Sequence, residues 1–183
     1  MYKRQREDQN RAEKLRIAQY AASLIRANDF VYLDAGTSTA LMIDFITARQ
    51  VIFVTDAPTH AKRLVQRGFT TYVLGGELKL STEALVGVET VHALQKYNFT
   101  KGFFGTNAVN LQTGISTPDI NEAEVKAQAL RRCRERYVLA DPSKFHKNSS
   151  VSFGKLSDAV ILTTEISAPG YRECKNIVEV AKT

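Results

Sequence analysis

Polar residues that could hold a ligand follow several apolar runs of this 183-residue chain. The first run, Phe30–Asp34, ends in a carboxylate, and a glycine with three hydroxyl residues comes directly after Ala35. These four residues are Gly36, Thr37, Ser38 and Thr39. Glycine permits a tight turn, while hydroxyls and main-chain N–H groups at the start of a helix suit a phosphate or a carboxylate. A Ser/Thr N-cap after a glycine turn would have the same sequence. The segment is neither a P-loop nor a dinucleotide fingerprint.

Further polar residues follow the other apolar runs. They are Asp56 after the second run, Gly75 and Gly76 after the third, Gly105, Thr106 and Asn107 after the fourth, and Asp141 with Lys144 after the fifth. Carboxylates accept hydrogen bonds from sugar hydroxyls, while Lys144 and the Thr-rich segment can hold a phosphate. Each Asp taken alone also suits a turn or a helix N-cap. Together they predict a polyhydroxylated, anionic ligand.

The elements that must position these residues alternate between strand and helix. Strands are predicted at Phe30–Asp34, Val51–Thr55, Thr70–Leu74, Phe99–Gly105, Tyr137–Asp141 and Ala159–Thr163. Helical patterns occupy residues 10–27, 41–46, 59–66, 89–97 and 119–132. The strands lack clear polar alternation, as strands of a parallel sheet covered on both faces do. This predicts an α/β fold of helix, sheet and helix layers. Ligands of such folds bind beyond the carboxyl ends of the strands, where the polar residues above lie.

Two segments interrupt this alternation. Leu74–Lys79 runs through Gly75-Gly76, which predicts a hairpin or an excursion over the sheet. Gly105–Pro118 is long and polar for a connection between a strand and a helix, which makes it a candidate functional loop.

Composition restricts the class of protein. Hydrophobic residues make up 44% and charged residues 24%, as in globular proteins, which excludes wholesale disorder. No apolar run is long enough to span a membrane, and the charged N-terminus is not a signal peptide, so we expect a cytoplasmic protein. The two cysteines and three histidines are widely spaced, so we expect no disulfide framework, no metal and no cofactor.

The formal net charge of +6 leaves a nucleic-acid-binding module as a third alternative. Positive charge gathers in residues 1–26 and in Arg131–Arg136. The second cluster ends a helical pattern, where cations suit the helix dipole, and no recognisable nucleic-acid-binding motif accompanies either cluster. Cys133 within it is predicted to be a half-buried structural thiol on the helix.

Six motifs in a fixed order carry a resemblance to a known family. They are Asp34–Thr39, Leu74–Gly76, Phe104–Ala108, Gly114–Pro118, Asn121–Lys126 and Ala140–Phe145. Over roughly residues 11–165 the chain resembles the C-terminal sensor domain of DeoR-type bacterial transcription regulators. The resemblance implies a fold similar to ribose-5-phosphate isomerase and the CoA transferases. It also implies a phosphorylated sugar as effector and control of a sugar-utilisation operon, usually as a repressor.

The resemblance also implies roles for individual residues. Gly36 to Thr39 would form the phosphate or anion site, and Asp141 and Lys144 would contact the effector. Gly105 to Asn107, Glu122 and Lys126 would lie in the same cleft, with Lys14 as a weaker candidate. Asp56 stands where the family usually has Asn.

The family carries an N-terminal winged helix-turn-helix that this chain lacks. We therefore interpret residues 1–10 as a linker remnant and residues 11–183 as the effector-binding domain. Operator DNA would be bound through the missing domain, and regulators that read paired half-sites are normally at least dimers, so a homo-oligomer is expected.

The same fold leaves an enzyme open as the alternative, either a sugar-phosphate isomerase or a CoA-transferase-like protein. Isomerisation needs a carboxylate base beside the reacting carbon, and residues 105–109 contain none. Glu122 and Glu124 are i, i+2 neighbours on a helix and face different directions, while Asp141 beside Lys144 suits binding or catalysis. The sequence favours a sensor without catalytic residues.

Overall fold

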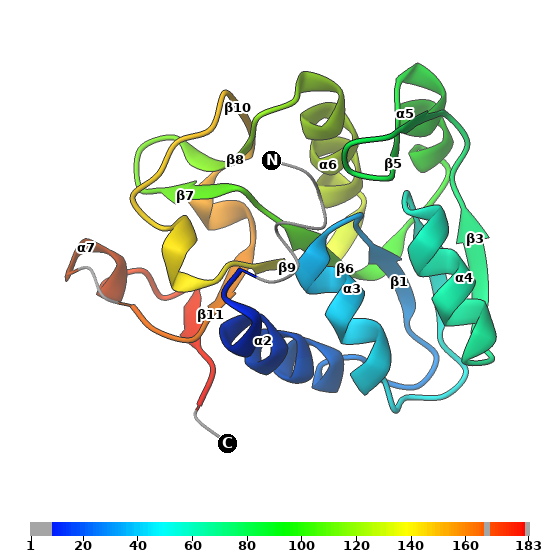
Figure 1. Ribbon diagram of the computed structural model, residues 1–183, viewed down its shortest axis with the longest axis horizontal. Coiled ribbons are helices and arrows are strands. Elements are labelled where there is room, and N and C mark those ends of the chain that lie inside the picture. Colours follow the sequence, from blue (N-terminus) through cyan, green and yellow to red (C-terminus); the bar gives the residue numbers. More distant parts are fainter. Residues whose placement is uncertain (1–8, 167–168, 182–183) are drawn as a thin grey trace.

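The computed structural model describes residues 9–166 and 169–181, and a seven-stranded sheet forms its centre (Figure 1). The strands are β1 (Phe30–Leu33), β2 (Ile52–Thr55), β3 (Thr70–Val73), β6 (Phe99–Gly105), β9 (Cys133–Leu139), β11 (Val160–Thr163) and β12 (Ile177–Glu179). Their order is β12-β11-β9-β6-β1-β2-β3, and every neighbouring pair is parallel. The predicted parallel sheet is confirmed, with β12 as a strand that the sequence did not reveal.

Helices cover both faces of this sheet. α2 (Arg11–Ser23), α3 (Thr37–Met42) and α4 (Pro58–Gln66) lie on one face, and α5 (Val88–Leu94) and α6 (Ile120–Arg131) lie on the other. Successive side chains of a strand point to opposite faces. Val31 and Leu33 accordingly pack in the core with α2 and α3, while Tyr32 packs in the core with α5 and α6. The predicted three-layer architecture is confirmed.

The edge strand β3 departs from the expected burial on both faces. Tyr72 and Val73 are 52% and 48% exposed, although they are as apolar as the residues of the central strands. β3 is the last strand of the sheet within the described residues, so its side chains have a neighbouring strand on one side only. The expectation of burial on both faces is wrong at this edge.

The glycine turn after β3 leads into the predicted hairpin. β4 (Glu77–Lys79) and β5 (Ala84–Val86) pair antiparallel, and Gly76 has φ 133°, a conformation that favours glycine. The candidate functional loop Gly105–Pro118 holds two short strands, and its first three residues lie at the end of β6 and directly after it. β7 (Ala108–Asn110) and β8 (Gly114–Thr117) form an antiparallel sheet with β10 (Val151–Gly154).

The strand predicted from Tyr137 begins earlier, at Cys133, directly after α6. The basic cluster Arg131–Arg136 therefore belongs mainly to β9. The sequence did not reveal this part of the strand, because its charged side chains interrupt the pattern of apolar residues. Cys133 is buried in that strand, so its assignment to a helix is wrong. Burial raises the pKa of the Cys133 thiol to about 12, which makes it unreactive at neutral pH.

Short elements complete the described chain. They are the 3-10 helices η1 (Ile43–Phe45), η2 (Pro142–Lys144) and η3 (Leu156–Asp158) and the helix α7 (Pro169–Arg172). Of the predicted linker remnant, residues 1–8 lie outside the described residues. Gln9 and Asn10 form a turn before α2.

Candidate functional site

A cleft opens at the carboxyl ends of β1 and β6, where the fold predicts a ligand. It is lined by Lys14, Ala35, Gly36, Thr37, Ser38, Thr82, Gly105, Thr106, Asn107, Glu122, Lys126 and Lys144. The space between its lining residues amounts to about 500 Å³, open solvent at its mouth included. Nine of the fourteen predicted site residues line it; Asp34, Thr39, Gly75, Gly76 and Asp141 do not.

A buried ion pair forms the floor of this cleft. Asp34 directly follows β1, and its carboxylate pairs with the Lys126 ammonium group from α6. The same Oδ2 atom accepts a hydrogen bond from the Gly105 N–H at 2.8 Å, and Lys126 Nζ lies 3.2 Å from the Gly105 carbonyl oxygen. Asp34 thus joins β1, β6 and α6, and it holds Lys126 at the cleft without lining the cleft itself.

The hydroxyl groups at the turn from β1 into α3 have two different surroundings. The buried Thr39 hydroxyl donates to the Asp34 carbonyl oxygen at 2.6 Å and accepts from the Gly36 N–H at 2.9 Å. Thr39 therefore fixes the turn, while Thr37 and Ser38 line the cleft at the start of the helix. A side chain at Gly36 would meet the Thr39 hydroxyl, which explains the glycine.

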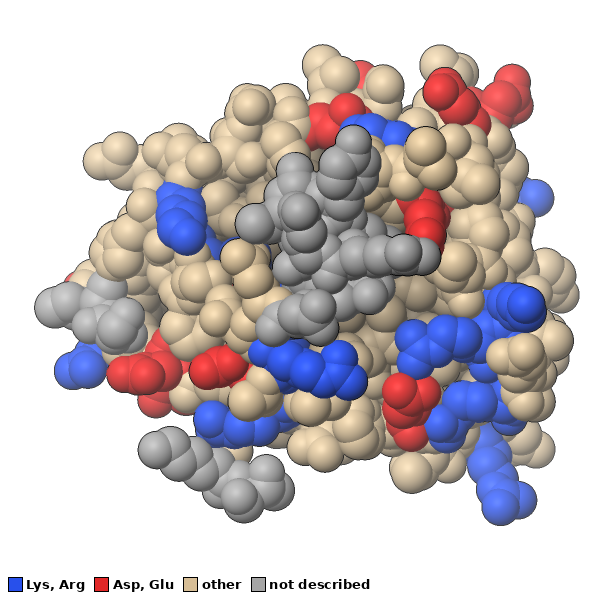
Figure 2. Space-filling view, in the orientation of Figure 1, with Lys and Arg blue, Asp and Glu red and all other residues tan. Residues whose placement is uncertain are grey.

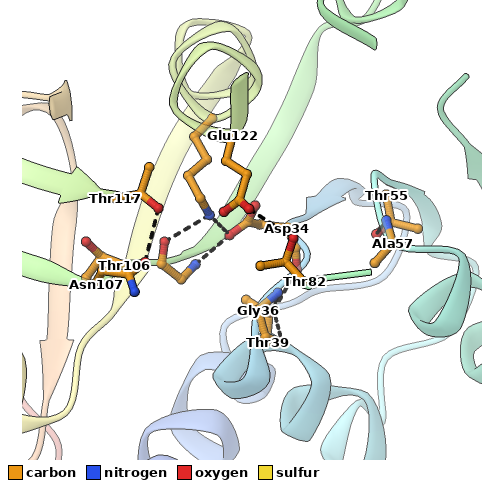
Figure 3. A network of polar contacts seen from close by, with 12 residues as sticks. Asp34, Gly36, Thr39, Thr55, Ala57, Thr82, Thr106, Asn107, Thr117 and Glu122 are labelled. Atoms are coloured by element: carbon orange, nitrogen blue, oxygen red, sulfur yellow. Dashed lines mark hydrogen bonds and ion pairs between the residues drawn. The ribbon is translucent and has the colours of Figure 1, made fainter. Parts of the chain in front are cut away.

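Glu122 connects the cleft to the β4–β5 hairpin (Figure 3). Its Oε1 atom accepts hydrogen bonds from Lys79 Nζ at 3.0 Å and from the Thr82 hydroxyl at 2.9 Å. Lys79 also pairs with Asp119 at 2.6 Å. Burial lowers the pKa of Lys79, but the hydrogen bonds that Lys79 donates to the carboxylates of Asp119 and Glu122 outweigh this effect, so the pKa of Lys79 lies above its usual value. Lys79 therefore remains charged and ties the hairpin to α6.

The residues after β9 supply the opposite wall. Asp141 is buried, and its Oδ1 atom accepts from the Ser143 N–H at 3.0 Å and from Asn10 Nδ2 at 2.8 Å. Lys144 Nζ lies 4.0 Å from Asp141 Oδ2 and lines the cleft. Asp141 thus supports the turn, and Lys144 is the group that a ligand can reach.

Gly75 and Gly76 lie apart from the cleft and have structural surroundings. The Thr90 hydroxyl donates to the Gly75 carbonyl oxygen at 2.7 Å. A side chain at Gly76 would collide with Thr90 and with the Val86 carbonyl oxygen, so the chain needs glycine there to start the hairpin.

Sequence reasoning gave too little weight to Lys14 and missed Ala35 and Thr82. Lys14 is only 3% exposed and lines the cleft from α2. Its position could have been found, because Lys14 shares the buried helix face of Ile17, Ala18 and Ala21 at i+3, i+4 and i+7. Thr82 reaches the cleft through the fold of the hairpin, for which local sequence gives no signal.

The cleft is rich in cations and hydroxyl groups. Lys14, Lys126 and Lys144 line it together with a single carboxylate among the described residues, Glu122. Within the same described residues no three His, Cys, Asp or Glu side chains come together as metal ligands would. The arrangement suits an anionic ligand with hydroxyl groups better than a cation.

A second carboxyl group, that of Asp56, is buried behind this floor. Its pKa is raised well above the usual value, first by burial and second by the negative charge of Asp34. The neutral, protonated form of the Asp56 carboxyl group therefore persists to a higher pH than that of an ordinary aspartate, and an Asn at this position would match that neutral form.

The raised pKa of Asp56 predicts a pH-dependent effect of Asp56→Asn. The folded protein keeps the proton that the unfolded chain releases above a pKa of about 3.9, so stability falls as the pH rises from there toward the folded pKa. The Asp56→Asn variant has no carboxyl group at this position, so its stability does not fall with pH for this reason. Its melting temperature relative to the parent should therefore increase as the pH rises above about 4, with up to about 1.4 kcal/mol of relative stability gained per pH unit. Asp44→Asn, at an exposed carboxylate, is the control. A difference in melting temperature that stays constant with pH would contradict a raised pKa of Asp56.

Comparison with known proteins identifies the family. The family model of the DeoR C-terminal sensor domain matches residues 9–165. This chain belongs to the DeoR family. The match covers all six motifs and every residue of the cleft lining, so the cleft lies within the sensor domain.

Curated relatives of this sensor domain are transcriptional regulators. The HTH-type transcriptional regulator FruR of Bacillus subtilis is 40% identical over 97% of this chain and 72% of its own length. The lactose phosphotransferase system repressor of Staphylococcus aureus is 34% identical over 84% of this chain and 63% of its own length. The chain therefore spans between 63% and 72% of the length of these two relatives.

Solved structures support the fold alone. Ribose 5-phosphate isomerase A of Methanocaldococcus jannaschii superposes with a TM-score of 0.54 at 19% identity, covering 74% of this chain and 55% of the isomerase. The eIF2B delta subunit of Chaetomium thermophilum gives 0.57 at 15% identity, covering 84% and 56%. An isomerase-like α/β fold is thus confirmed for the DeoR sensor domain. None of the helices in the described residues is long and apolar enough to cross a membrane.

Proposed function

We propose that this DeoR sensor domain binds a phosphorylated sugar and belongs to a transcriptional repressor of the cytoplasm. Binding of the sugar phosphate would control whether this repressor occupies its operator DNA. The observation that carries the proposal is the cleft lining, in which three lysines and several hydroxyls surround one carboxylate. Lysines and hydroxyls donate to phosphate oxygens, carboxylates accept from sugar hydroxyls, and side-chain amides both accept from and donate to them. No cofactor is needed for such binding.

Each side of the cleft would then have its own role. Lys144, together with Thr37 and Ser38, would hold the phosphate, because Lys144 lines the cleft from η2 after β9 while Thr37 and Ser38 line it from the first turn of α3. Glu122 and Asn107 would bind sugar hydroxyls. Asp34, Gly105, Thr106 and Lys126 would form the floor, with Thr39 and Asp141 fixing the two turns.

The signal would leave the cleft through α2. Asn10, immediately before this helix, donates to Asp141 at 2.8 Å and to the Ser143 hydroxyl at 3.0 Å, and Lys14 in its first turn lines the cleft. A ligand that changes these contacts would shift the population of α2 orientations, provided that it binds the two states with different affinity. Operator DNA would be bound by a domain preceding residue 1.

The enzyme alternative fits the cleft less well. Among the described residues, Glu122 is the only carboxylate of the lining, and its Oε1 atom already accepts from Lys79 and Thr82. A general base must instead be ready to accept a proton from the substrate. A sensor without catalytic activity therefore remains the proposal.

A thermal-shift screen of the chain against sugar phosphates, the matching free sugars, inorganic phosphate and CoA tests this function. Binding to the folded state at a hundredfold excess over Kd stabilises it by about 2.7 kcal/mol, which raises the melting temperature by a few degrees. One or two sugar phosphates should give this shift, and their free sugars should not. Conversion of the sugar phosphate in the same mixture would establish an isomerase, and a shift by CoA alone would favour the transferase alternative.

This domain alone should bind duplex DNA weakly and without sequence preference. Figure 2 shows Lys and Arg side chains gathered on the side of α4 and near α2, whereas Asp and Glu are scattered. Such contacts release counterions, so the affinity should fall steeply between about 50 and 200 mM salt. Fluorescence anisotropy with a labelled duplex measures this. A sequence-specific complex that persists at the higher salt concentration would show that the nucleic-acid-binding alternative is correct.

A further inference from the structure

The β4–β5 hairpin turns a charged side chain toward α6 and leaves two leucines exposed. Lys79 lies opposite the buried Ala84 in the hairpin, and its ammonium group reaches the start of α6. Its chain neighbours Leu78 and Leu80 are 57% and 89% exposed. Burying a leucine stabilises a fold, whereas a charged group loses hydration when it is buried. The orientation of the hairpin therefore points to a role for Lys79 beside the cleft.

Lys79 contacts two carboxylates at the start of α6. Its ammonium group pairs with Asp119 at 2.6 Å and with Glu122 Oε1 at 3.0 Å. Asp119 precedes α6 and accepts from the Glu122 N–H at 3.0 Å, so it caps the helix. Burial raises the pKa of Asp119, but the hydrogen bond from Lys79 outweighs this effect, so the pKa of Asp119 lies below its usual value. Asp119 thus holds the main chain of Glu122, and Lys79 holds its side chain.

These contacts occupy one oxygen of the Glu122 carboxylate and leave the other for a ligand. Oε1 accepts from Lys79 Nζ and from the Thr82 hydroxyl at 2.9 Å, whereas none of the residues that the structure describes donates to Oε2. The Glu122 side chain is 11% exposed and lines the cleft. Because Oε1 is bound twice, the carboxylate cannot turn freely. Glu122 therefore offers a ligand one acceptor at a fixed position.

The amide group of Asn107 is held in a similar way. The buried Thr117 hydroxyl donates to Asn107 Oδ1 at 3.1 Å, as Figure 3 shows. This contact leaves the amide nitrogen of Asn107, which is a donor, for a ligand in the cleft. The cleft thus combines a fixed acceptor with a fixed donor. Sugar hydroxyls match both groups, since a hydroxyl can donate as well as accept.

We propose that Lys79 and Thr82 are positioning residues of the effector site: by fixing Glu122 they make the domain select a phosphate ester that carries sugar hydroxyls over one that carries none. The inference rests on the proposed function, because it concerns the sugar part of the same ligand. Lys79 does not line the cleft and acts through Glu122. Without either contact the carboxylate turns more freely, and a bound hydroxyl then pays for ordering it. The phosphate contacts stay as they are.

Calorimetric titration with two kinds of phosphate ester tests this selection. One is whichever of fructose 1-phosphate, fructose 6-phosphate, tagatose 6-phosphate and glucose 6-phosphate binds most tightly, and the other is methyl phosphate, which has no sugar hydroxyls. The parent should bind the sugar phosphate at least about tenfold more tightly. Lys79→Met and Thr82→Val should each raise the Kd of the sugar phosphate about fivefold or more, and should change that of methyl phosphate less than about twofold.

Two further variants separate positioning from a general effect on the hairpin. Thr82→Ser keeps the hydroxyl that donates to Glu122, so it should retain the selectivity of the parent. Ser81→Ala, at the neighbouring position of the hairpin, is the matched control for Thr82→Val and should also bind as the parent does. If Lys79→Met fails to fold, Thr82→Val still tests the inference, because its substitution leaves the ion pairs of Lys79 in place.

The outcomes distinguish this inference from the proposed function. A parent that binds none of the sugar phosphates more tightly than methyl phosphate would contradict the proposed function and the positioning role with it. A selective parent whose selectivity persists in Lys79→Met and Thr82→Val would overturn the positioning role alone. The same conclusion would follow if the two variants bound both kinds of ester equally more weakly, since that result indicates a damaged cleft.

Discussion

Replacing Lys126 with Met is expected to destabilise the sensor domain by about 3–5 kcal/mol, because it leaves the buried Asp34 carboxylate without its cation. Chemical denaturation of parent and variant measures the loss. The double variant Asp34→Asn/Lys126→Met should recover part of it, since Asn at this position carries no charge and still accepts from the Gly105 N–H. A Lys126→Met protein as stable as the parent would show that the pair does not support the cleft floor.

The same variant should also lose sugar-phosphate binding, and a second buried ion pair separates this loss from instability. Lys101 pairs with Asp29 at 2.6 Å near the start of β1 and β6, at the end of the sheet opposite the cleft. Lys101→Met should be destabilised to a similar extent but should bind the ligand as the parent does at a temperature where both variants are folded. Loss of binding in both variants would mean that global stability, and not the Lys126 ammonium group, explains the effect.

Lys144→Met is expected to weaken sugar-phosphate binding by about ten- to a hundredfold with little change in stability. Hydrogen bonds to charged groups contribute about 1.5–3 kcal/mol, and Lys144 is partly exposed at the cleft mouth. Calorimetric titration measures the change. Lys147→Met, three residues further on at an exposed position, is the control and should retain the parent Kd. Equal affinities of the two variants would remove Lys144 from the phosphate site.

The sheet could be predicted from the sequence because its central strands are short apolar runs that the helices cover on both sides. The cleft position followed from this topology, since Asp34, Gly105 and Asp141 come at or directly after strand ends. The strands β7, β8 and β12 each contain no more than two large apolar residues, and β9 has charged residues at its second to fourth positions, so no run of apolar residues reveals them.

Individual roles at the site were harder to predict than its location. Asp34 and Lys126 are 92 residues apart, and sequence alone could not show that Asp34 lies beneath the cleft as the partner of Lys126. Gly75 and Gly76 have the same sequence character as a ligand-binding turn, yet packing against Thr90 explains them. In both cases a long-range contact, absent from the local sequence, decides whether a residue contacts a ligand or supports its neighbours.

A crystal structure with the sugar phosphate that gives the largest thermal shift tests the central claim most directly. The phosphate should lie within hydrogen-bonding distance of Lys144 and of Thr37 or Ser38, with a sugar hydroxyl at Glu122. Lys126 should stay paired with Asp34 beneath the ligand. A ligand bound elsewhere on the domain, with this cleft empty, would contradict the assignment of the cleft as the effector site.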